Sequence, residues 1–251
     1  MNYEANRRVE TSARTFAIVE RLSALDRVGV SALADELGMS KGIVHNHLCT
    51  LRELGYVRKV DDRYQLSPKL LGVGLRARSN APLYRFGHDL CREFAGQADT
   101  GVALCQHTDG DCLVVDAYEV APTTDLAVGT ALGLSGSLVG LAIRLASGEG
   151  GVDAAGEYDI DALRASFEAA GSVTGPFSTS HEQDGVAVPV LGTDGACHGG
   201  VGVLLPEGHT DQRRQRLTEA TRSLRTRIER RFDAEWPGER SFATEKHSWV
   251  G

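Results

Sequence analysis

The stretch VSALADELGMSKGIVHNHL, residues 30–48, decides the fold of the first part of the chain. Its first half predicts a short helix that begins near Ser31, a good capping residue, and ends at Gly38, where a left-handed backbone is needed. The next two residues leave a very short connection before a second helix, which Ser40 caps and which runs to about Leu54. Two helices joined this tightly are typical of a helix-turn-helix.

A further helix is expected upstream of this pair, with Thr11 or Ser12 as its cap. Apolar residues recur there at three-residue steps, with one more beside them: Phe16, Val19, Leu22, Leu25 and Ile18. This spacing predicts an amphipathic helix that packs against the pair.

A strand hairpin and a linker follow the pair. Residues 56–60 and 63–66 predict two strands around a tight turn at residues 61–62. A Ser-Pro step at residues 67–68 then opens a helix that runs to about residue 78, because proline suits the first helical position. The next four residues, 79–82, are expected to form a hinge. Three helices and a hairpin in this order predict a winged helix-turn-helix.

The rest of the chain mixes helices and strands, which indicates a second domain. The expected elements are a helix at 83–98, strands at 102–107 and 112–118, a third strand at 126–128, a helix at 135–146, a loop at 147–160, a helix at 160–170, strands at 185–191 and 199–205, and a long helix from Thr210 to about Phe232. We therefore expect an α+β protein of two domains. The expected boundaries are 1–66 for the winged helix-turn-helix, 67–82 for the linker helix and hinge, 83–235 for the second domain and 236–251 for a flexible tail.

The second helix of the pair is the one expected to contact DNA. Only the major groove admits a helix and displays a distinct pattern for each base pair. The N-terminal residues of such a helix meet the base edges, and Asn46 can bond an adenine edge in bidentate fashion. Cations on the wing suit phosphates or the minor groove. The candidate DNA-binding residues are Ser40, Lys41, Gly42, His45 and Asn46 on the helix and Arg58, Lys59 and Arg63 on the wing.

The charge is divided unevenly along the chain, whose net charge is −7 over 251 residues. Residues 1–78 carry 13 Lys and Arg and 9 Asp and Glu, a net charge of +4. Residues 79–251 carry 14 and 25, a net charge of −11. The positive part can face phosphates, and the acidic part would keep the remainder away from DNA.

Composition also bears on the compartment. No apolar run approaches the ~20 residues of a membrane span, and the polar first ten residues lack the apolar segment of a signal peptide. The cysteines are odd in number and show no CxxC spacing, which fits a reduced cytoplasm. They are Cys49, Cys91, Cys105, Cys112 and Cys197. We expect a cytoplasmic protein with no membrane partner.

The motif residues also resemble a known family. Residues 30–48, followed by LRELGYV at 51–57, look like the DNA-binding domain of IclR-family transcriptional regulators. The segments YQLS at 64–67 and LLG at 70–72 resemble that family's wing end and linker helix. The resemblance implies a GAF-like α/β effector domain without a cofactor. It also implies a small-molecule effector as a partner beside double-stranded DNA. Our hypothesis for the assembly is a homodimer or homotetramer paired through the linker helix and the first helix.

The effector-domain motifs depart from the pattern of that family. Its helix after the Gly-rich turn usually begins Leu-His-Ala-Thr and continues Gly-Lys-Ala, whereas here Ser135 and Leu141 replace the His and the Lys. The strand at residues 202–206 lacks the usual serines. A pocket with fewer polar groups implies a more apolar effector or the loss of effector binding. The matching positions are Ser135, Ser137, Leu138, Val139, Asp184, Gly185, Gly202 and Leu204, of which Leu138, Val139 and Leu204 can equally be core.

The sequence lacks the motifs of two common enzyme classes and of a metal site on the second helix of the pair. Residues 133–136 are not the Gly-x-Ser-x-Gly of a nucleophile elbow, and residues 199–202 lack the Lys-Ser/Thr pair of a phosphate loop, so we do not expect an enzyme. On a helix, His45 and Cys49 share a face while His47 points away, so we expect no metal site there.

Two alternatives stay open. The first is a metal- or thiol-sensing regulator, in which Cys105, His107, Cys112, Cys197 and His198 converge. The second is a winged helix that binds protein and has no effector. The Arg-rich last helix fits a solvated or subunit-facing surface better than a second nucleic-acid patch, because acidic residues alternate with its arginines.

Overall fold

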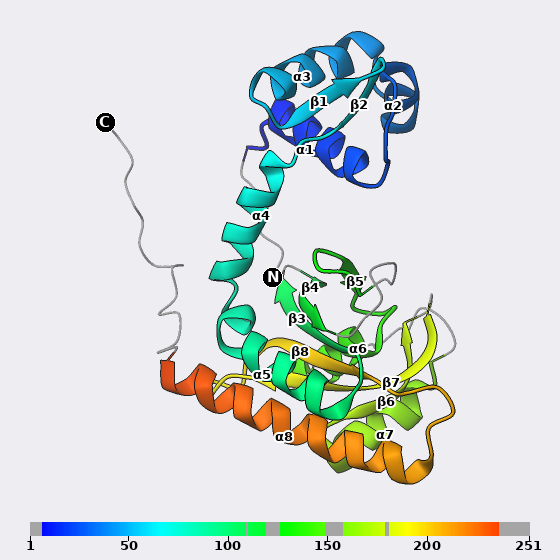
Figure 1. Ribbon diagram of the computed structural model, residues 1–251, viewed down its shortest axis with the longest axis vertical. Helices are drawn as coiled ribbons and strands as arrows, with labels where there is room; N and C mark the ends of the chain where they lie inside the picture. Colours follow the sequence, from blue (N-terminus) through cyan, green and yellow to red (C-terminus); the bar gives the residue numbers. More distant parts are fainter. Residues whose placement is uncertain (1–6, 109, 119–125, 149–157, 179–180, 236–251) are drawn as a thin grey trace. The chain divides into compact units, whose positions relative to one another are not determined.

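The computed structural model describes residues 7–108, 110–118, 126–148, 158–178 and 181–235. It divides into two compact units, residues 1–78 and residues 79–251. The elements of the first unit are α1 (Glu10–Ser23), α2 (Val30–Leu37), α3 (Lys41–Glu53), β1 (Val57–Val60), β2 (Arg63–Leu66) and α4 (Lys69–Asn80), the last of which continues two residues past the boundary (Figure 1). This is the expected winged helix-turn-helix.

The helix-turn-helix forms for the reasons that the sequence indicates. Gly38 ends α2 with a φ of 61°, a left-handed conformation that glycine adopts without strain. The hydroxyl oxygen of Ser40 accepts the N–H of Ile43 at 3.3 Å and so caps α3. The predicted apolar face of α3, which consists of Val44, Leu48 and Leu51, is buried against α1 and α2.

Two other predicted helix starts were wrong. Helix α1 begins at Glu10 after an extended Val9, and α2 begins at Val30 after an extended Gly29. Neither start has a side-chain cap, because Thr11, Ser12 and Ser31 already lie within the helices. An N-cap residue must itself be extended, and at both sites that conformation falls on an earlier residue.

The buried face of α1 also differs from the predicted one. Ile18 and Leu22 are buried, whereas Phe16 is 66 % exposed. A three-residue step turns a helix by roughly 300°, so residues spaced by three drift by about 60° at each step. The step of four from Ile18 to Leu22 keeps a single line of contact with the core.

The wing is a two-stranded antiparallel hairpin in which Arg58 pairs with Gln65 and Lys59 pairs with Tyr64. Asp61 and Asp62 have φ values of 48° and 63°, as a two-residue type I′ turn requires. Tyr64 also exchanges both backbone hydrogen bonds with Val28, at 2.8 and 3.1 Å. This bridge fixes the hairpin to the segment that precedes α2.

Helix α4 extends into residues 79–82, the segment expected to form a hinge. It continues through Asn80, and Ala81 alone separates it from the next helix, which begins at Pro82. Ala81 is extended, with φ −68° and ψ 122°. A proline disfavours the α conformation only in the residue directly before it, so Ser79 and Asn80 stay helical.

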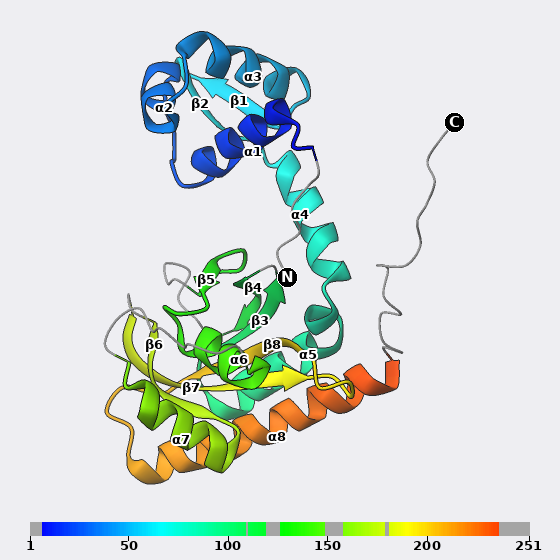
Figure 2. The ribbon, with the colours of Figure 1, turned by 180° about the vertical axis from the view of Figure 1, so that it is seen from behind.

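The second unit is a six-stranded antiparallel sheet in the order β5-β4-β3-β8-β7-β6. Its elements are α5 (Pro82–Ala98), β3 (Val102–Thr108), β4 (Asp111–Tyr118), β5 (Ala131–Gly133), α6 (Leu138–Ser147), α7 (Ile160–Ala170), β6 (Val173–Ser178), β7 (His181–Leu191), β8 (Cys197–Leu204) and α8 (Asp211–Glu235). Helices α5 and α8 pack on one face of the sheet, and α6 and α7 lie on the other (Figure 2). The predicted α+β fold class is confirmed.

Several predictions for this unit need correction. The strand expected at 126–128 is a turn, and the strand lies instead at Ala131–Gly133. Helix α6 begins at Leu138 rather than Ser135, because Ser137 caps it by accepting the N–H of Gly140 at 3.1 Å. Strand β6 was not predicted, because it contains Gly175 and Pro176, two residue types that are uncommon in strands. Proline is tolerated there because β6 is an edge strand.

The other expected elements are present. Asp159 caps α7 and Thr210 caps α8 through side-chain oxygens that accept backbone N–H groups at 3.0 and 3.2 Å. Most of the expected loop at 147–160 and all of the expected tail at 236–251 lie outside the described residues. Among the residues that the structure describes, no helix is both long and apolar enough to cross a bilayer.

Candidate nucleic-acid interface

Helix α3 presents one polar face to solvent. Lys41, Gly42, His45, Asn46 and Cys49 are all exposed, opposite the buried face that anchors the helix. The first turn of α3 carries no acidic residue, so the positive end of the helix dipole is not neutralised there. This end of the helix suits an anionic partner.

The start of α3 brings Ser40, Lys41 and Gly42 together. The Ser40 hydroxyl uses its oxygen to accept the N–H of Ile43, and its proton remains available to a phosphate oxygen. No atom lies within 4 Å of where a Cβ on Gly42 would stand. The glycine therefore leaves the backbone bare for close approach by a partner.

The two neighbouring histidines of α3 point to different places. The ring nitrogens of His45 lie 3.7 Å from the Cys49 sulfur on the exposed face. The His47 Nδ1 lies 2.9 Å from the Thr15 hydroxyl, which donates to the Thr11 carbonyl at 2.9 Å. Since that hydroxyl has only one proton, we infer that Nδ1 of His47 donates to it. His47 therefore holds α3 against α1.

The three cations predicted on the wing lie on two different faces of the hairpin. Arg58 and Arg63 lie on one face of the hairpin, because their cross-strand partners Gln65 and Val60 share that face. Lys59 lies on the other face and bonds Asp62 at 2.6 Å. This hydrogen bond raises the pKa of the lysine and lowers the pKa of the Asp62 carboxyl. Arg58 and Arg63 are exposed and lie outside this ion pair.

Most of the candidate effector residues are packed in the second unit. Leu138 and Val139 are fully buried, and Ser137 is 1 % exposed and serves as the cap of α6. The Phe177 ring lies directly over two glycines of neighbouring strands. A Cβ on Gly185 would meet this ring at 2.4 Å, and a Cβ on Gly202 would meet it at 2.3 Å. These glycines thus make room for a side chain of the protein itself.

Ser135 and Asp184 are the partly exposed members of this set. The Ser135 hydroxyl accepts the Arg144 guanidinium at 2.6 Å, which ties the turn before α6 to the helix. Phe177 was missed because it lies in the unpredicted strand β6. The only sequence signal for it was the pair of glycines that its ring covers.

The cysteines of the second unit, three buried and one half-buried, have unreactive surroundings. Burial raises the pKa of the Cys91 thiol and raises that of Cys197 to about 11. A hydrogen bond with Cys105 and burial raise the pKa of Cys112. Thiols are nucleophiles only when ionised, so this packing does not favour a thiol sensor. The described residues contain no group of three or more His, Cys, Asp or Glu placed to hold a metal.

The fold and the exposed face of α3 define a class of protein, the winged helix-turn-helix followed by an α+β sheet domain. Residues 12–61 match the family model of the IclR helix-turn-helix domain. The match lies within the first unit and confirms the resemblance of its sequence to the IclR helix-turn-helix.

Individual relatives agree with this assignment. The KdgR regulator of Escherichia coli, named an HTH-type transcriptional regulator, is 32 % identical over 89 residues, which are 35 % of this chain and 34 % of that protein. The match spans 42 % or less of the length of the curated relatives. These relatives bear the names of transcription regulators rather than of enzymes.

Solved structures extend the likeness in fold to nearly the whole chain. An IclR transcriptional regulator from Alicyclobacillus acidocaldarius has a TM-score of 0.74 at 16 % identity, over 90 % of this chain and 99 % of that one. An IclR homologue from Microbacterium hydrocarbonoxydans, complexed with 4-hydroxybenzoate, has a TM-score of 0.68 at 17 % identity, over 86 % and 98 %. The chain has the fold of IclR regulators.

Proposed function

We propose that the protein is a cytoplasmic, sequence-specific DNA-binding transcription regulator whose second unit responds to a small-molecule effector. The main support is the exposed polar face of α3, whose opposite face is buried in the core. The N-terminal end of this helix also carries no acidic residue to neutralise its dipole. Ser40, Lys41, Gly42, His45 and Asn46 would meet the DNA, with bases read by His45 and Asn46. Arg58 and Arg63 would contact phosphates, and Lys59 would contribute less because Asp62 holds it.

We further propose that the DNA-binding form is a homodimer paired through α4 and α1. Helix α4 has no buried residue and contains two glycines, each of which costs about 1 kcal/mol relative to alanine in a helix. Leu71 and Leu75, one turn apart, are 62 % and 44 % exposed, and Phe16 on α1 is 66 % exposed. Such a helix gains its stability from packing, and a second copy would supply the apolar partner.

The effector is proposed on the face of the sheet covered by α6, where Ser135 remains partly accessible. Asp184, the other partly exposed candidate, lies instead in a hollow beside the start of α8. The Microbacterium relative was solved with 4-hydroxybenzoate, which favours an organic effector for this class. In this chain Leu138, Val139, Gly185, Gly202 and Leu204 would line a site only if Phe177 moved. Effector binding would then be coupled to a rearrangement of β6, which requires a ligand with higher affinity for the opened state.

Asn46→Ala is expected to remove base discrimination while leaving general DNA affinity intact. One bidentate contact to an adenine contributes roughly 1–3 kcal/mol of discrimination, so specific affinity should fall about 5- to 150-fold in total. Mobility shifts with the specific site and with random DNA measure both quantities. An equal loss on both DNAs would show that Asn46 does not contact a base.

Arg58→Ala is expected to weaken binding to all sequences alike. The guanidinium is exposed on the free face of the wing, so its loss should remove one phosphate contact and reduce the salt slope by about 1. Titrations over a salt series measure that slope. Lys59→Ala is the matched control and should change the slope less, because its ammonium already bonds Asp62. Equal salt slopes for the wild type and Arg58→Ala would show that Arg58 does not contact a phosphate.

A further inference from the structure

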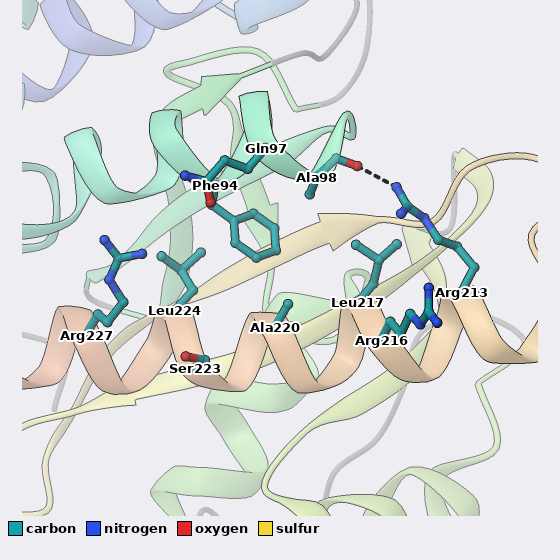
Figure 3. Close-up of a pocket in the computed structure, with 10 residues that line it drawn as sticks. All are labelled: Phe94, Gln97, Ala98, Arg213, Arg216, Leu217, Ala220, Ser223, Leu224 and Arg227. Carbon is teal, nitrogen blue, oxygen red and sulfur yellow. Dashed lines mark hydrogen bonds between the residues drawn. The ribbon is translucent and has the colours of Figure 1, made fainter.

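A groove of about 330 Å³ runs between α5 and α8 on the face of the sheet away from α6 (Figure 3). Its floor is apolar and consists of Phe94, Leu217, Ala220 and Leu224, of which Phe94, Leu217 and Leu224 are 8 %, 3 % and 1 % exposed. The hollow exists because small side chains, Ala98 on α5 and Ala220 on α8, line it where larger ones would fill it.

The rim of the groove is cationic. Arg213, Arg216 and Arg227 line it together with Gln97, and its lining contains no acidic residue. Arg216 has no bonded partner within the part of the chain that the structure describes. Arg213 donates to the Ala98 carbonyl at 2.5 Å, which leaves further N–H groups of the same guanidinium available. This rim stands out in a unit that carries a net charge of −11.

A comparison within the same unit supports the preference for an anion. A second hollow, between the start of α8 and strands β6 and β7, also contains two arginines. There they are accompanied by Asp184, Asp211 and Glu219, so the charges offset one another. Of these two hollows, only the α5–α8 groove combines an apolar floor with arginines, Arg213 and Arg216, that no acidic lining residue offsets.

Ion pairs hold the walls of the groove. The Arg231 guanidinium bonds both carboxylate oxygens of Asp89 at 2.7 and 2.8 Å, and Arg227 bonds Glu93 at 2.8 Å. Both pairs join α8 to α5. A site whose walls are already held loses less conformational freedom when a ligand binds.

We propose that this groove binds a small carboxylate that carries an apolar body. The body would cover the floor around Phe94 and Leu217, and the carboxylate would accept from Arg216 at the rim, where a guanidinium offers paired donors. The volume suits about ten to fifteen non-hydrogen atoms, given that a cavity of about 150 Å³ accommodates benzene. This site is independent of the proposed DNA binding and of the proposed effector face.

Calorimetric titration of the full-length protein without DNA tests the proposal, with octanoate and its neutral analogue octanamide as probes. We expect octanoate to bind at least about tenfold more tightly, because only the charged group forms charge-assisted hydrogen bonds. Arg216→Gln should reduce octanoate affinity by about the same factor and leave octanamide unchanged. Arg164→Gln on α7, across the sheet, makes the same charge change and should alter neither.

Three results would overturn the proposal. They are equal affinity for the two probes, equal effects of Arg216→Gln and Arg164→Gln, and no octanoate binding at millimolar concentration. Ala220→Phe should also abolish octanoate binding by filling the groove, and its circular dichroism spectrum shows whether it folds. Should it not fold, the two surface arginine variants decide the question. Octanoate affinity that falls as protein concentration rises would show that a second copy covers the groove, which also contradicts a ligand site.

Discussion

Leu71→Glu is expected to lower operator affinity by about 10²- to 10⁴-fold while leaving the winged helix folded. In the proposed dimer, the second recognition helix binds as an intramolecular event, and bivalency of this kind contributes about that factor. A glutamate at position 71 would place a charge in the apolar contact of α4 and separate the subunits. Sedimentation velocity should show monomers at concentrations where the wild type is dimeric.

The matched control is Val73→Glu. Val73 is 55 % exposed on the same helix, but two residues along it lies roughly 200° around the axis from Leu71. It should remain dimeric and bind the operator almost as the wild type does. A dimeric Leu71→Glu, or equal losses for both variants, would show that α4 does not pair the subunits through this face.

Phe177→Ala is expected to lower the free energy of unfolding by about 3–5 kcal/mol, the usual cost of removing a buried phenyl ring. The ring is fully buried, and it fills the space above Gly185 and Gly202. Equilibrium denaturation of the second unit, monitored by fluorescence or circular dichroism, measures the loss. A loss below about 1 kcal/mol would mean that neighbouring side chains collapse into the space without cost.

A double-mutant cycle sharpens this expectation. Gly202→Ala alone should destabilise the protein, because its Cβ would meet Phe177 at 2.3 Å and Val139 at 2.6 Å. In the Phe177→Ala background the clash with the ring is gone and the contact with Val139 remains, so the two effects should be non-additive. Additive losses would show that the ring and the glycine do not share this space.

Much of the winged helix could be predicted from sequence because its signals are local. Gly38 and Ser40 act within their own turns, and the aspartates at 61 and 62 alone define the hairpin turn. The true starts of α1 and α2 could not be predicted, because Val9 and Gly29 carry no capping side chain. The exposure of Phe16 follows from how the helix turns over three residues.

The candidate sites show the same division. The exposed face of α3 follows from the period of one helix, so Asn46 and His45 were placed from sequence. The opposite faces of Arg58 and Lys59 follow from the alternation of side chains along one strand. The shared face of Arg58 and Arg63 depends on cross-strand register, and the ion pair of Lys59 depends on Asp62. Phe177 fills the space above Gly202. This residue lies in the edge strand β6, which the sequence does not predict because it contains Gly175 and Pro176. Contacts between distant segments leave no pattern in a single sequence.

Specific DNA binding through α3 can be tested by a mobility shift of the purified protein on the DNA upstream of its own gene. Unrelated DNA of equal length is the comparison, over a salt series. We expect a complex on the upstream DNA that survives moderate salt while binding to unrelated DNA is lost. Equal and salt-labile binding to both DNAs, or no binding at low salt, would contradict it and favour a winged helix that binds protein.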